Sequence, residues 1–150
     1  MDDPAAVARR IIEGNIYLTL ATADADGRPW ASPVWFAHDE LARFVWVSKP
    51  EARHSRNLEA RPQVGIVIFD STVGAGQAEA VYAEAEAKRL EGTEEEYAVE
   101  VFNRRSEALG WPSWTVEDIR SPAALRLYGA AASALSVLGP GDERIAVELG

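Results

Sequence analysis

The sequence contains no cysteine, only two histidines and no apolar run long enough to cross a membrane as a helix. The missing cysteines exclude disulfides, thiol nucleophiles and cysteine-ligated metal centres. Two histidines, His38 and His54, are too few for most histidine metal sites, so we expect no metal. Because no signal-like apolar segment opens the chain, we expect a cytoplasmic protein.

Basic residues are also scarce, since 15 Lys and Arg face 24 Asp and Glu and give a formal net charge of −9. An acidic chain fits poorly against nucleic-acid phosphates or an anionic membrane surface, so neither partner is expected. The sequence has no G-x-S-x-G, H-E-x-x-H, P-loop or G-x-G-x-x-G motif. If the chain is an enzyme, we therefore expect a bound cofactor to supply the reactivity, and we assign no catalytic side chain.

The sequence does contain a succession of short apolar segments with the period of strands. Its 150 residues suit a single domain, 1–150. Apolar alternation predicts a three-strand antiparallel meander, and later apolar segments predict four more strands. The expected strands are Ile16–Ala23, Trp30–Ala37, Leu41–Val47, Val64–Phe69, Gln77–Leu90, Ala123–Leu138 and Arg144–Leu149. The continuous apolar run Val64–Phe69 is expected to be buried on both faces.

Two helices have recognisable ends in the sequence. Asp2 or Asp3 can cap a helix over Ala5–Glu13, with Pro4 at its start. A second helix is expected over Thr93–Leu109, because it opens with the Thr-x-x-Glu spacing of a capping box.

The most informative stretch is Phe44–Leu58, which reads FVWVSKPEARHSRNL. An apolar strand stops at Ser48, and the Ser48–Glu51 spacing with Pro50 predicts a capped helix at that point. The cations that crowd its first two turns are Lys49, Arg53, His54 and Arg56. The helix dipole is already positive there, so a bound anion such as phosphate would resolve the conflict. The alternative is a solvated basic helix that is paired with acidic neighbours.

Pro33 lies inside the expected strand Trp30–Ala37. Proline cannot donate to a strand ladder, so Pro33 indicates an edge, a bulge or an interruption of the sheet. An interrupted strand would leave backbone groups free for a ligand, whereas a simple edge proline needs no function.

The order of these elements and three segments, RPWASPVWF (28–36), FVWVSKPEARHSRNL (44–58) and RPQVGIVIF (61–69), resemble the pyridoxamine 5′-phosphate oxidase-like proteins. The resemblance implies a mainly β fold with flanking helices, namely a six- to seven-stranded antiparallel split β-barrel that binds FMN. It implies an oxidoreductase in which bound FMN exchanges hydride or electrons with a small molecule. It also implies a homodimer with the flavin at the subunit interface, which would cover the exposed strand edges of a short barrel.

The resemblance also assigns cofactor contacts to individual residues. In chain order they are Ser32, Pro33, Val34, Val47, Ser48, Lys49, Arg53, His54, Asn57 and Gln77. The first three would face the isoalloxazine ring, and Val47 with Ser48 would contact the ribityl and phosphate region. Arg53 and His54 occupy the positions of the family's phosphate-gripping Arg-Lys pair, and Gln77 would reach across the dimer.

Departures from the family pattern shape the expected function. His54 replaces the usual lysine, so one phosphate cation depends on pH. Ser32 stands where the true oxidases commonly have arginine, and their basic C-terminal substrate motif is not found. Pyridoxamine phosphate is therefore not the expected substrate. The alternatives are a deazaflavin-dependent reductase and a non-catalytic flavin or haem carrier.

Trp111 and Trp114 lie in the loop that follows the long helix. They are expected either to plug the space between the helix and the barrel, or to line a flat substrate pocket over the flavin.

Overall fold

In the computed structural model, residues 2–149 are described; Met1 and Gly150, the ends of the expected domain, lie outside them. The helices and strands, in chain order, are α1 (Pro4–Glu13), β1 (Tyr17–Ala23), β2 (Pro29–Asp39), β3 (Arg43–Ser48), α2 (Arg53–Ala60), β4 (Gln63–Phe69), β5 (Ala80–Arg89), α3 (Thr93–Ala108), η1 (Val116–Ile119), β6 (Arg126–Leu138), η2 (Pro140–Asp142) and β7 (Arg144–Val147). No helix in this part of the chain is long and apolar enough to span a bilayer.

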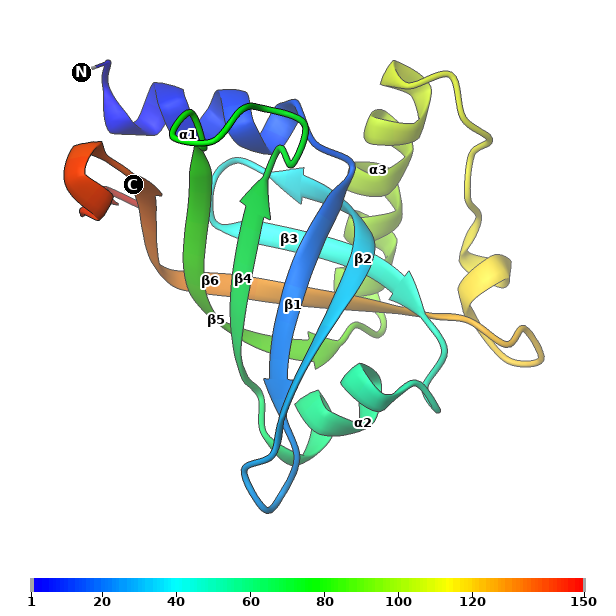
Figure 1. Ribbon diagram of the computed structural model, residues 1–150. Coiled ribbons are helices and arrows are strands. Elements are labelled where there is room, and N and C mark those ends of the chain that lie inside the picture. The colour runs from blue at the N-terminus through cyan, green and yellow to red at the C-terminus, as the bar shows by residue number, and fades with distance from the viewer. Residues whose placement is uncertain (1, 150) are drawn as a thin grey trace.

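The strands form a barrel in the order β3-β2-β1-β4-β5-β6, which the pairing of β3 with β6 closes. All the pairings are antiparallel, and β7 adds a seventh strand outside the ring by pairing with β6. In Figure 1, β1, β2 and β4 run steeply in front of β3 and β6, which cross behind them. This arrangement confirms the predicted mainly β, split-barrel fold.

Strand β4 shows how the barrel wall is built. Val64, Ile66 and Ile68 point into the core, with exposed fractions of 6%, 3% and 0%, while Gly65 and Val67 are only half-buried. The expectation that this strand is buried on both faces is therefore wrong. A barrel wall has one face toward the core, and the outer face of β4 is only partly covered.

The three α-helices cover different parts of the barrel (Figure 1). Helix α1 lies across one end and α2 across the opposite end, while α3 packs outside the wall against β2, β3 and β6. The Asp3 carboxylate accepts the Ala6 N–H at 3.2 Å, which confirms the expected cap of α1. The expected capping box of α3 is wrong, because Thr93 is already helical and Gly92, at a φ of 65°, is the N-cap.

Only part of β2 is paired on both sides. Phe36 is bonded on both sides, since it pairs with Trp46 of β3 and its N–H donates to the Ile16 carbonyl at 3.2 Å. The segment 37–39 pairs with β3, and Pro29–Trp35 pairs with β1 alone among residues 2–149. Pro33, opposite Thr19 of β1, therefore lies on an open edge, where its missing N–H leaves no gap in a ladder.

Candidate functional site

The junction between β3 and α2 is tighter than the sequence predicts. Ser48 is the last residue of β3 and pairs with Arg126 of β6, so it is held in the strand. A turn follows, in which the Ala52 N–H donates to the Lys49 carbonyl at 3.1 Å. The predicted helix start with a Ser48–Glu51 capping box is wrong, because α2 begins at Arg53 and its N-cap Ala52 makes no side-chain hydrogen bond. The first N–H groups of α2 therefore have no side-chain cap.

Ser48 and His54 meet across this turn. The Ser48 hydroxyl lies 2.9 Å from His54 Nε2, and Ser48 is buried while His54 is half-buried. Burial lowers the pKa of His54 below the ordinary histidine value, because it disfavours the charged ring. The environment supplied by the chain itself thus opposes the rise in pKa that a bound phosphate would cause.

Arg53 projects from the start of α2 toward β2. Its guanidinium lies 4.2 Å from the centre of the Trp30 ring, which is a cation–π distance. Among residues 2–149, no carboxylate lies within 4.0 Å of Lys49, Arg53 or Arg56. The acidic neighbours that would make this a solvated, paired helix are therefore not in contact with its cations.

Asn57 lies on the inward side of α2 instead of facing the solvent. It is 5% exposed, and its Nδ2 donates to the Thr22 hydroxyl of β1 at 3.0 Å. The Thr22 hydroxyl donates in turn to the Trp30 carbonyl of β2 at 3.4 Å. Asn57 thus fastens α2 to the strands beside the open edge, a role in positioning that the sequence did not reveal.

The residues expected to face the flavin ring lie along that open edge. Pro33 is exposed and Ser32 is half-buried, but Val34 is 5% exposed and belongs to the barrel core. At Val34, therefore, only the backbone can face a ligand that lies outside the barrel. Val47, on the neighbouring β3, is half-buried.

Gln77 lies apart from the other predicted cofactor residues. The strand expected at Gln77–Leu90 begins only at Ala80, so Gln77 is an exposed residue of the β4–β5 loop. This loop lies beside α1, to which Arg10 and Glu79 tie it at 2.6 Å, and at the opposite end of the barrel from α2 (Figure 1). Within one chain, Gln77 is therefore separated from the site on α2.

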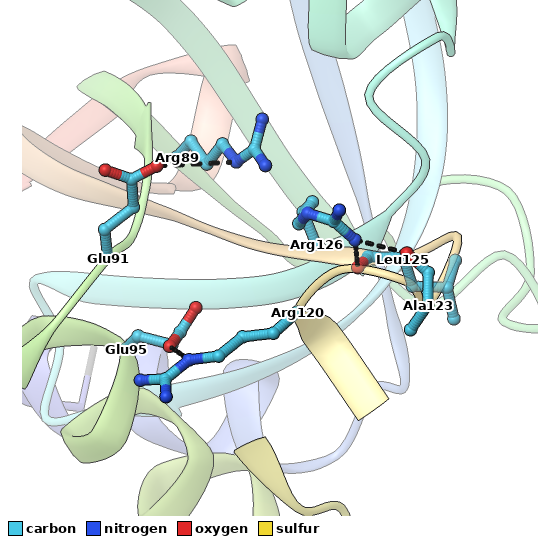
Figure 2. A network of polar contacts seen from close by, with 7 residues as sticks. All are labelled: Arg89, Glu91, Glu95, Arg120, Ala123, Leu125 and Arg126. Atoms are coloured by element: carbon cyan, nitrogen blue, oxygen red, sulfur yellow. Dashed lines mark hydrogen bonds and ion pairs between the residues drawn. The ribbon is translucent and has the colours of Figure 1, made fainter. Parts of the chain in front are cut away.

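A second group of basic residues, which the sequence analysis missed, surrounds a cavity of about 320 Å³ at the foot of α3. Figure 2 shows Arg120 directed at Glu95, a carboxylate only 4% exposed, with Nε to Oε1 at 2.5 Å. Arg126 Nη1 donates to the carbonyl oxygens of Ala123 and Leu125 at 2.5 and 2.6 Å. Arg89 lies 3.9 Å from Glu91. These partners are distant in sequence or in loops, and no local motif marks them.

Trp111 and Trp114 line a cleft of about 460 Å³ together with Trp35 of β2. Both are half-buried, and Trp114 packs edge-on against Phe102 of α3 at 6.0 Å between ring centres. They therefore fill part of the space between α3 and the barrel, and they also form an open wall. Trp35 was not among the residues predicted for this pocket.

A third cavity, of about 420 Å³, lies between α3 and the strands β3, β5 and β6. Part of its charged rim is engaged within the chain, since Lys88 bonds Glu94 at 3.0 Å and the Tyr97 hydroxyl donates to Asp39. None of the predicted cofactor residues lines it. No group of three or more metal-ligating side chains occurs between residues 2 and 149.

The chain is similar in sequence to known proteins. A family model described as pyridoxamine 5′-phosphate oxidase matches residues 5–134. Haem oxygenase HutZ of Vibrio cholerae is 45% identical over 60 residues, which are 40% of this chain and 34% of HutZ. Pyridoxine/pyridoxamine 5′-phosphate oxidase of Bordetella pertussis is 38% identical over 64 residues, 43% of this chain and 30% of the oxidase. These alignments thus cover about a third of each relative's length.

One solved structure shows the same architecture over most of its length. The crystal structure of HutZ, described as the haem storage protein of Vibrio cholerae, matches with a TM-score of 0.69 and 24% identity. The match covers 89% of this chain and 93% of that one. At this identity the likeness shows a shared fold.

Proposed function

Since the chain belongs to the pyridoxamine 5′-phosphate oxidase family, we propose that it binds FMN and acts as an oxidoreductase on a small molecule other than pyridoxamine phosphate. The observation that carries this proposal is the group of cations at the start of α2, which has no carboxylate contact within 4.0 Å among residues 2–149. The bound flavin would supply hydride or electron transfer, and the chain would bind and orient it.

The residues around this helix start fit a phosphate group. The uncapped N–H groups of α2 and the helix dipole favour an anion at this point. Arg53 can donate two parallel hydrogen bonds to phosphate oxygens from its position over Trp30. Ser48 and Lys49 would add a hydroxyl and a second permanent cation beside it.

The proposal is tested by titrating the purified chain with FMN and with riboflavin, using quenching of flavin fluorescence. Hydrogen bonds to a charged group contribute about 1.5–3 kcal/mol each, so riboflavin should bind at least about tenfold more weakly than FMN. Equal affinity for the two would show that the basic segment is only a solvated surface. A bound flavin that cannot be reduced by NADH or NADPH and reoxidised by any acceptor would favour a carrier.

A haem carrier is the second candidate, because the relative with 45% identity is named a haem oxygenase. His54 Nε2 is already bonded to Ser48, whereas His38 Nδ1 lies 2.9 Å from the Glu40 carbonyl. If that Nδ1 carries the proton, His38 Nε2 is left as the free nitrogen for iron. A haem absorbance band that shifts in His38→Ala, with no FMN binding, would favour this function. The same titration with a deazaflavin cofactor tests the remaining alternative.

We also propose that the chain works as a homodimer with the flavin between subunits. Pro29–Trp35 offers an open strand edge, and the nearby Tyr17 and Trp30 are 60% and 42% exposed. An open edge next to exposed aromatic rings favours association. Light scattering should give twice the chain mass at micromolar concentration, and a monomer with flavin bound would contradict this.

A further inference from the structure

The cleft beside β2 has aromatic rings on two sides. Tyr17 of β1 and Trp35 of β2 are direct partners in the strand register and form its floor. Trp111 lies edge-on to Trp35, with ring centres 4.8 Å apart and planes at 64°, and Trp114 extends the wall. A cleft of about 460 Å³ is within the range that accepts a small ligand.

The wall of the cleft is held in place although it has no regular secondary structure. The Asn103 side chain of α3 accepts the Trp114 N–H at 2.7 Å and donates to the Trp114 carbonyl at 2.8 Å. The Trp111 N–H donates to the Ser106 carbonyl at 2.8 Å. Two separate sets of hydrogen bonds thus hold the backbone that carries the two indoles. A wall that is already ordered loses little entropy when a ligand binds.

The cleft continues along the strand that is expected to face the flavin. Side chains alternate along a strand, so Trp35 and Pro33 lie on the same outward side of β2. Two residues of strand span about 7 Å, which is close to the width of one aromatic ring system. A flat molecule in the cleft would therefore border a flavin ring placed against Pro33.

The charge of the cleft limits what it can hold. Within residues 2–149, Asp118 is the one charged residue that lines it, and no Lys, Arg or His does so. The Asp118 carboxylate accepts the Thr115 N–H at 2.7 Å and the Thr115 hydroxyl at 3.1 Å. An anionic group would find no cation to pair with and would meet a carboxylate, whereas a neutral or cationic ring would not.

We propose that this cleft binds a flat aromatic molecule that is uncharged or cationic, and that it discriminates against anionic ones. As a substrate site it rests on the proposed flavin function, but binding in the cleft can be measured without flavin. The class proposed here differs from a phosphorylated vitamin, because a phosphate would have no basic partner in the cleft.

The test uses the indole N–H signals of the ¹⁵N-labelled chain, which has five tryptophans. Quinoxaline and quinoxaline-2-carboxylate share one ring system and differ in charge. Quinoxaline should shift the signals of Trp111 and Trp114 until saturation and leave that of buried Trp46 unmoved. The carboxylate should bind about tenfold more weakly. Equal binding of the two probes, or no shift of the cleft signals, would overturn the proposal.

Variants make the assignment specific. Trp111→Ala should weaken quinoxaline binding about tenfold, while Phe69→Ala, which removes an aromatic ring that is 46% exposed on β4, should leave it unchanged. Asp118→Asn can keep the contact to Thr115, and it should improve binding of the carboxylate probe several-fold. An equal loss in Trp111→Ala and Phe69→Ala would indicate non-specific binding and overturn the proposal.

Flavin binding is followed in the same samples by absorbance and by the Trp30 signal, next to Arg53. Quinoxaline shifts without any FMN binding would sustain the ligand site and overturn the flavin function. FMN binding without quinoxaline shifts would sustain the flavin function and overturn the ligand site.

Discussion

Arg53 and Arg120 lie in two basic groups that differ in what surrounds them. Arg120 meets the buried carboxylate of Glu95 at 2.5 Å, at the foot of α3. Arg53, at the start of α2, has no carboxylate within 4.0 Å among residues 2–149 and lies over the Trp30 ring. The number of cations is similar in both groups, so number alone does not identify an anion site.

Whether a carboxylate pairs with its cations decides what each basic group can do. A buried carboxylate such as Glu95 must be paired, so Arg120 is committed to holding the first turn of α3 against the segment before β6. Arg53 and Arg56 of α2 are exposed and have no carboxylate within 4.0 Å among residues 2–149, so their hydrogen-bond donors stay available. The group around Arg120 therefore stabilises the fold, and the group around Arg53 can bind a ligand. Three variants test this division.

Arg53→Ala should have the largest effect, and on cofactor binding alone. It removes a guanidinium that is charged at every physiological pH, so the free energy of FMN binding should weaken by about 1.5–3 kcal/mol at every pH. Arg56→Ala, which removes an exposed cation from the same helix, is the matched control and should change affinity much less. Fluorescence titration measures both. Unchanged affinity in a folded Arg53→Ala protein would mean that the phosphate site is misplaced.

Arg120→Ala should have the opposite effect to Arg53→Ala, because it should lower the stability of the fold and leave the FMN affinity unchanged. It leaves the buried Glu95 carboxylate without its partner, which should lower the free energy of unfolding by about 1–3 kcal/mol. Glu91→Gln is its control, because the Arg89–Glu91 pair is long, at 3.9 Å, and its carboxylate is exposed, so it should contribute less than about 0.5 kcal/mol. Urea denaturation gives both values. A drop in FMN affinity for Arg120→Ala would show that both basic groups contribute to cofactor binding, which would contradict the division.

His54→Ala should have the smallest effect, and one that depends on pH. Burial lowers the pKa of His54 from its ordinary value near ~6.5, so the ring is neutral at neutral pH and begins to charge only in more acidic solution. Without ligand, the unfolded chain takes up this proton first, so stability should fall as pH drops through that range. A phosphate dianion favours the charged ring, so His54→Ala should cost FMN affinity only about two- to threefold, and only below about pH 6.5.

The control for charge is His54→Lys, which should tighten FMN binding and flatten its pH dependence. Titrations across the range from about pH 8 to pH 5.5 follow both variants. If His54→Ala loses the same affinity at both ends of this range, the bond to Ser48 and not the charge of the ring explains its role.

The order of elements and the basic stretch 49–56 could be predicted because each has a local signal. The barrel was implied by the family resemblance, because its closure pairs β3 with β6, which lie far apart in the sequence. The capping box at Ser48 was mispredicted because the β3–β6 ladder, formed with residues far along the chain, holds Ser48 extended. Asn57 was assigned to the cofactor from the family resemblance, and its bond to Thr22 could not be predicted because the two residues lie 35 apart in the sequence. The Arg120–Glu95 pair joins residues 25 apart and shows no motif.

The chain of hydrogen bonds from Asn57 through Thr22 to the Trp30 carbonyl has a consequence for cofactor choice. Helix α2 is joined to β1 by the 3.0 Å bond from Asn57 to Thr22, which contributes about 1 kcal/mol, and the Thr22 hydroxyl makes a longer and weaker contact, at 3.4 Å, with the Trp30 carbonyl of β2. These contacts oppose movement of α2 along β2, so the start of α2 and the edge at Pro33 keep a nearly constant separation. Under the proposed function, a ligand whose phosphate-to-ring span matches that separation would bind best, so the length of the cofactor as well as its charge would decide which one binds.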